Sequence, residues 1–121
     1  MASHNELGTH GETLALNYLQ TKGYEVIEKN YRYLKAEVDL IAKHNNVVVF
    51  VEVKARSTNF FGEPELAVTL SKQKLLIAAA DYYASSNQLQ NEIRFDVIAI
   101  IINKNETTIK HIEDAFYPQA D

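Results

Sequence analysis

The chain has 121 residues, 46% of them hydrophobic and 23% charged, the composition of an ordinary globular domain with one core. It contains no cysteine, which excludes disulfides and thiolate metal sites. No apolar run approaches the length of a membrane span, and no signal peptide is expected before the first helix. The net charge of −4 argues against general nucleic-acid binding, and these features together predict a single cytoplasmic domain over residues 1–121 with no membrane partner.

Charge is unevenly distributed along the chain. Between Lys29 and Lys74, eight basic side chains outnumber five acidic ones, so this segment carries +3 and the remainder −7. An anionic ligand would be attracted to the positive segment. Scattered, solvated surface charges would give the same count, and both interpretations stay open.

Hydrophobic periodicity and breaker residues predict seven elements in chain order. They are a helix over 5–22, strands over 24–33, 37–43 and 47–54, a helix over 71–87, and strands over 93–102 and 107–112. The αβββαββ order predicts a mixed sheet flanked by helices.

Both helices carry local signals. Gly23 ends the first helix, whereas Gly8 and Gly11 fall inside its first turns and indicate either a late start or a close approach of the backbone to another element. The side of the second helix that faces the core is expected to carry Leu75, Ala79, Tyr82 and Tyr83.

The strongest candidate for chemistry lies where two predicted strands end. Asp39 precedes Glu52 by thirteen residues, and Glu52 and Lys54 share one face of a nearly apolar strand. Charges that end a buried strand need partners, and a hairpin would bring these three side chains together. Two carboxylates suit Mg²⁺ or Mn²⁺, with the Val53 carbonyl as a third ligand, and the lysine can orient an attacking water. A structural ion pair at a sheet edge is the alternative.

Glu12, on the first helix, is a candidate third carboxylate. It could complete the metal shell beside Asp39 and Glu52. It could equally be a surface glutamate whose negative charge suits the helix N-terminus. The sequence does not separate these two interpretations.

Basic and aromatic residues after the third strand suggest a nucleic-acid surface. Arg56 can fork onto a phosphate, Phe60 and Phe61 could stack on bases or pack in the core, and the second helix opens with further candidates. These are Lys72, Gln73 and Lys74. Lysines in a first turn oppose the helix dipole, so they are either simply solvated or placed to receive phosphate. Arg94 and Asp96 share a strand face; they could pair with each other or support the site, and they are expected to be mainly structural.

Several of these residues together resemble a known pattern. They are Gly8-x-x-Gly11-Glu12, Glu37-Val38-Asp39-Leu40-Ile41, Phe50-Val51-Glu52-Val53-Lys54-x-Arg56, Phe61-Gly62-x-Pro64, Lys72, Arg94-Phe95-Asp96 and Ala115-Phe116. The set resembles the PD-(D/E)xK signature of restriction-endonuclease-like nucleases and, more closely, the YraN-like family of small bacterial proteins predicted to be endonucleases. The resemblance implies an α/β, restriction-endonuclease-like αβββαβ core, similar to that of archaeal Holliday junction resolvases. It also implies an active-site set of Glu12, Asp39, Glu52 and Lys54.

The expected function is therefore Mg²⁺- or Mn²⁺-dependent hydrolysis of DNA phosphodiester bonds, on branched or damaged DNA. The alternative is a non-catalytic adaptor for nucleic acid or protein that has kept a nuclease fold. The intact Asp39, Glu52 and Lys54 favour the enzyme, and the acidic net charge favours the adaptor. A homodimer would present two sites to a two-fold junction.

Overall fold

The computed structural model describes residues 4–57 and 68–118 and contains the predicted elements in the predicted order. Their bounds are α1 His4–Thr21, β1 Glu25–Tyr33, β2 Ala36–His44, β3 Val47–Arg56, α2 Leu70–Ser86, β4 Glu92–Ile102 and β5 Thr107–Phe116. The mixed α/β class is confirmed. The predicted aromatic loop at Phe60 and Phe61 lies outside the described residues.

The strands form one sheet in the order β1-β2-β3-β4-β5. β3 and β4 are parallel and are joined through α2, whereas the other neighbouring strands are antiparallel. β5 extends beyond the predicted end at residue 112 because a bulge opposite Phe95 and Val97 lets pairing resume at Phe116. Asp114 takes a positive φ of 54° within that bulge.

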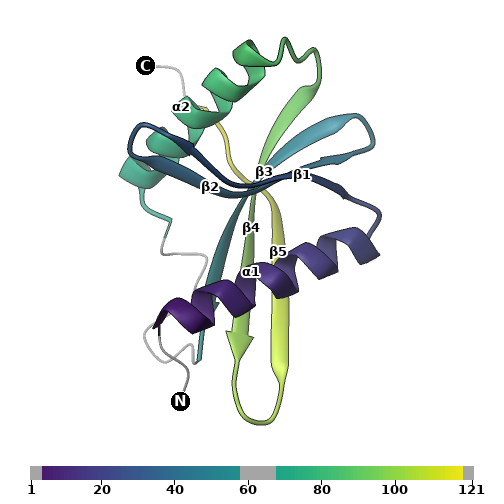
Figure 1. The fold of residues 1–121 in the computed structure, drawn as a ribbon, viewed down its shortest axis with the longest axis vertical. Coiled ribbons are helices and arrows are strands. Elements are labelled where there is room, and N and C mark those ends of the chain that lie inside the picture. Colours follow the sequence, from purple (N-terminus) through teal and green to yellow (C-terminus); the bar gives the residue numbers. More distant parts are fainter. Residues whose placement is uncertain (1–3, 58–67, 119–121) are drawn as a thin grey trace.

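The helices cover opposite faces of the sheet (Figure 1). Ala15 and Leu19 of α1 pack on strand residues that include Leu40 and Val51. The core on the other face contains Phe50 and Val97 together with four buried α2 residues, Leu76, Ala79, Ala80 and Tyr83.

The predicted buried side of α2 is therefore wrong in part. Leu75 and Tyr82 are 41% and 50% exposed. The apolar residues of α2 do not gather on one face of the helix, so its sequence alone does not show which face is buried. The packing of α2 against the sheet decides which residues are buried. Within the described parts of the chain, no helix is long and apolar enough to cross a membrane.

Candidate active site

The predicted carboxylates meet where β2 separates from β3. The register of the two strands ends at the pair Leu40 and Val51. One residue beyond, a side chain takes the place of the backbone pairing: Oδ2 of Asp39 accepts a hydrogen bond from the Val53 amide at 2.7 Å. Asp39 thereby lies against the β3 backbone between Glu52 and Lys54, as the hairpin argument predicts.

Glu52 is the most buried member of this group, at 4% exposure. Its Oε1 accepts from Lys72 Nζ at 2.7 Å and lies 3.7 Å from Lys54 Nζ. Its Oε2 is buried without a hydrogen-bond partner among the described residues. A buried carboxylate oxygen without a partner is costly, so this atom marks a place where a cation or a donor would be stabilised.

Burial and neighbouring charges shift the pKa of three groups in this site. Burial, and then the charge of Glu52, raise the pKa of Asp39 from 3.8 to about 7, although the Val53 amide opposes the shift. Burial, and then the neighbouring Lys72, lower the pKa of Lys54. Burial also lowers the pKa of Lys72, but its hydrogen bond to Glu52 and the charge of Glu52 outweigh burial, and the net shift is upward.

Glu12 is brought towards this group by a tight contact between α1 and β3. A Cβ added to Gly11 would lie 2.5 Å from the Cβ of Ala55, so only glycine allows the helix to lie this close. This contact explains one of the two helix glycines, whereas an added Cβ on Gly8 would meet nothing within 4 Å.

The charges of the neighbouring carboxylates affect the pKa of Glu12. Burial and then Glu37 raise the pKa of Glu12, the charge of Glu52 raises it further, and a hydrogen bond from Asn30 opposes the rise. Even so, within residues 4–57 and 68–118 no three His, Cys, Asp or Glu side chains are arranged to hold a metal ion. The predicted metal ligation by Glu12 stays a prediction. Asp39 and Glu52 remain the two side-chain oxygen ligands that a hard cation could use, beside the main chain of Val53.

Within the described part of the chain, the predicted nucleic-acid residues divide into three that do not contact the carboxylates of the site and one, Lys72, that does. Arg56 and Lys74 are exposed, at the end of β3 and on α2. Gln73 donates to the Val68 carbonyl at 3.1 Å, beside the helix cap formed by Thr69.

The exception is Lys72, whose ammonium lies on Glu52 rather than in open solvent. The sequence did not reveal this contact, because it joins α2 to β3 across the fold. The signal that could have indicated it is a lysine in a helix first turn, where positive charge needs a compensating anion. We refer below to Asp39, Glu52, Lys54 and Lys72 as the carboxylate–lysine cluster.

Comparisons with known proteins place this chain in a family. Residues 11–100 match the uncharacterised protein family UPF0102. The chain belongs to the UPF0102 family. A UPF0102 protein of Christiangramia forsetii is 52% identical over 117 residues, 97% of this chain and 98% of its own. Those of Thermodesulfovibrio yellowstonii and Clostridioides difficile are 49% and 45% identical, over 93% and 94% of this chain and 96% and 99% of their own. The family-level part of the YraN-like resemblance is thereby confirmed.

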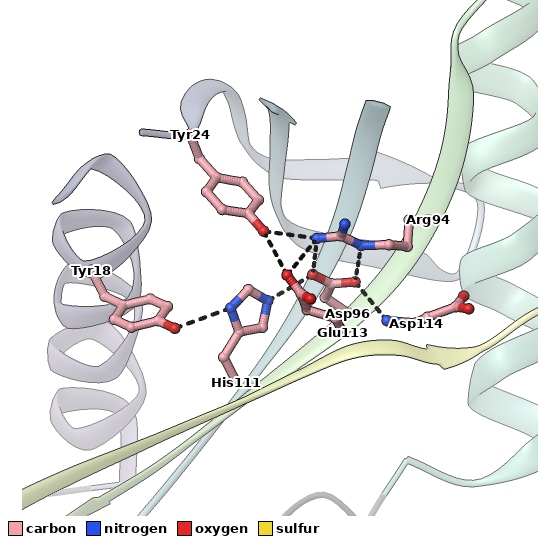
Figure 2. Close-up of polar contacts among 7 residues, drawn as sticks. All are labelled: Tyr18, Tyr24, Arg94, Asp96, His111, Glu113 and Asp114. Atoms are coloured by element: carbon pink, nitrogen blue, oxygen red, sulfur yellow. Dashed lines mark hydrogen bonds and ion pairs between the residues drawn. The ribbon is translucent and has the colours of Figure 1, made fainter. Parts of the chain in front are cut away.

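The UPF0102 match contains the whole carboxylate–lysine cluster and also the centre of a second polar network (Figure 2). Asp96, fully buried, accepts from Arg94 Nε and Nη2 at 2.8 Å each and lies 2.6 Å from His111 Nε2. It also accepts from the Asp114 amide at 3.0 Å, which holds the bulge in β5. Burial alone would raise the pKa of Asp96, but these hydrogen bonds outweigh it and lower the pKa. Of the two alternatives for Arg94 and Asp96, the structure shows that they pair with each other.

Proposed function

We propose that this UPF0102 chain is a divalent-metal-dependent endonuclease of the PD-(D/E)xK type that hydrolyses DNA. The observation that supports this most directly is the Glu52 Oε2 atom, buried without a partner beside Asp39 and Lys54. A purely structural ion pair would satisfy both oxygens of the glutamate. Here Oε1 of Glu52 is paired with lysine, whereas Oε2 has no partner among the described residues and would be stabilised by a positive charge.

Mg²⁺ or Mn²⁺ could supply this positive charge because both ions prefer oxygen ligands. Asp39, Glu52 and the Val53 carbonyl would hold the ion, with Glu12 as an additional carboxylate. The bound cation would supply positive charge at the scissile phosphate. It would also offset the cost of burying the Asp39 charge beside Glu52, the two largest causes of the raised pKa of Asp39.

The lysines of the cluster would act on the water and on the developing charge. Lys54 has a lowered pKa, so at a given pH a larger fraction of it is neutral and able to accept a proton than for a free lysine, which suits it to orient the attacking water. Lys72 fixes the carboxylate of Glu52 in one orientation. Arg56, Gln73 and Lys74 would bind the DNA backbone. A homodimer in the cytoplasm, with two such sites, would suit branched DNA.

Cleavage of defined DNA substrates tests this proposal. Linear, flapped and four-way DNA would be incubated with Mg²⁺ or Mn²⁺, and Asp39→Asn would serve as the matched inactive variant. We expect metal-dependent products from the wild type and none from Asp39→Asn. Equal cleavage by the two proteins would indicate a contaminating nuclease, and no cleavage of any substrate would contradict the proposal.

The adaptor remains the second candidate because of two observations. No set of three metal-binding side chains is arranged within the described residues, and Lys72 already neutralises part of the Glu52 charge. An adaptor would bind its partner without metal, and loss of Lys54 would leave that binding unchanged. Binding to the same DNA panel in EDTA, compared between wild type and Lys54→Ala, separates the two candidates.

A further inference from the structure

The turn between β1 and β2 presents a leucine that neither the core nor the carboxylate–lysine cluster uses. Leu34 is 85% exposed, and its φ is +53°, in the left-handed region that bulky side chains enter only at a cost. Hairpin turns that need positive φ are usually filled by glycine, asparagine or aspartate. Neither packing nor turn chemistry accounts for a leucine here, and strained residues of this kind concentrate where ligands are contacted.

Strand pairing and a ring contact hold the turn that carries Leu34 in place. Strand pairing continues up to Tyr33 and Ala36, the residues on either side of the turn. Tyr33 also stacks on Tyr82 of α2, with ring centroids 4.4 Å apart and an interplanar angle of 19°. The tip is therefore anchored both to the sheet and to the helix that carries Lys72.

Positive charge flanks the leucine. The Arg32 side chain is 78% exposed although it pairs with Glu37 at 2.7 Å, and Lys35 is exposed. Glu37 lies two residues before Asp39 on β2, so the tip and the candidate active site are carried by one strand. An exposed apolar side chain between two cations suits a polyanion with apolar faces, such as DNA at an opened base step. A second copy docked symmetrically at the tip would instead bring like charges together.

We propose that the β1–β2 turn is a wedge that recognises DNA at unstacked base steps. Leu34 packs against or between bases at a branch point, and Arg32 and Lys35 bind the flanking phosphates. This inference rests on the proposed nuclease function and deepens it, because it names the residues that would select branched DNA over a linear duplex.

The test compares Leu34→Asn and Leu34→Gly with Leu75→Gln, an exposed leucine on α2 that serves as the control. Affinity for a four-way junction and for a linear duplex is measured by anisotropy, in EDTA and in Ca²⁺. A 2-aminopurine base at the branch point reports unstacking. Asn and Gly accept the backbone of position 34, so both variants should keep or raise the melting temperature.

We expect the wild type and Leu75→Gln to favour the junction and to increase 2-aminopurine fluorescence. Both Leu34 variants should bind the junction about tenfold more weakly, equivalent to about 1.4 kcal/mol, lose the fluorescence increase, and bind the duplex unchanged. Junction binding and fluorescence that match the wild type would overturn the wedge and leave the nuclease proposal standing. A wild type that neither binds nor cleaves any DNA would overturn both. A Leu34 variant that only turns a dimer into a monomer would assign the tip to self-association and overturn the wedge.

Discussion

Asp39 and Glu52 lie in surroundings that favour a proton or a cation between them over two free negative charges. Both side chains are buried, at 9% and 4% exposure, and Lys72 and Lys54 approach only one oxygen of Glu52. The site therefore carries a stability cost in the metal-free chain. The role of the two residues therefore depends on whether a proton, a lysine or a metal ion offsets their negative charge.

Removing the charge of Asp39 should stabilise the metal-free protein. Its pKa is raised from 3.8 to about 7, so the folded state holds a proton that the unfolded chain has already lost. The resulting destabilisation is absent below about pH 4, grows as the pH rises towards about 7, and is constant above it. In EDTA, Asp39→Asn should therefore gain stability over the wild type at about pH 8 and gain little at about pH 4, as measured by urea unfolding. Asp81→Asn, an exposed aspartate on α2, should show no such pH-dependent gain.

Lys54→Ala should abolish most cleavage without removing metal binding. In the proposed mechanism the lysine acts on the water and on the developing charge, and loss of one such group typically lowers the rate by a factor of about 10² to 10³. Single-turnover cleavage measures the first effect and Mn²⁺ calorimetry the second, with the exposed Lys43→Ala as the control. Near wild-type turnover in Lys54→Ala would assign this lysine to a structural ion pair.

At the scale of elements, the site depends on how closely α1 and α2 approach the end of β3. Gly11 lets α1 lie against Ala55, and α2 extends Lys72 onto Glu52 from the opposite face of the sheet. The Schellman-type end of α1 at Gly23, with φ of +89°, then turns the chain into β1.

The two glycines of α1 should respond in opposite ways to alanine. Gly11→Ala places a methyl group 2.5 Å from the Ala55 Cβ, so it should destabilise the fold by about 1–3 kcal/mol and displace Glu12. Gly8→Ala meets nothing within 4 Å and should stabilise the helix by up to about 1 kcal/mol. Urea unfolding of the two variants checks this pair. A Gly11→Ala variant as stable as the wild type would show that the contact relaxes easily.

The elements were predictable from sequence because their signals are local. The apolar strands, the helix end at Gly23 and the meeting of Asp39 with Glu52 all follow from periodicity and hairpin geometry. Periodicity and hairpin geometry did not predict the contact of Lys72 with Glu52 or the exposed side of α2. Both depend on how α2 packs against the sheet, and no local pattern encodes that packing. The same is true of His111 beside Asp96, which requires the register of β4 and β5.

For the molecule as a whole, the proposed DNA binding by an acidic chain requires a local excess of positive charge. The net charge is −4, whereas the segment from Lys29 to Lys74 carries +3 and contains the carboxylate–lysine cluster. DNA binding is therefore expected to be weak and strongly dependent on salt and on divalent cations, because the cation removes negative charge from the binding surface.

Replacing the exposed cations near the site should flatten this salt dependence. Lys72 is engaged with Glu52, so the cleaner pair is Arg56 and Lys74. Removing one cation that binds a phosphate lowers the slope of log affinity against log salt by about 0.9 on duplex DNA, so Arg56→Ala/Lys74→Ala should lower it by about 1.8. Anisotropy titrations at several salt concentrations measure the slope. A double variant with the wild-type slope would place the DNA surface elsewhere on the molecule.

Calorimetric titration with Mn²⁺ measures whether Asp39 and Glu52 form a divalent-cation site. The wild type should bind the ion with an affinity that rises with pH through about 7, as Asp39 loses its proton. Asp39→Ala should remove that binding, and the exposed Asp81→Ala should retain it. Binding that is unchanged in Asp39→Ala, or absent from the wild type at every pH, would contradict the account.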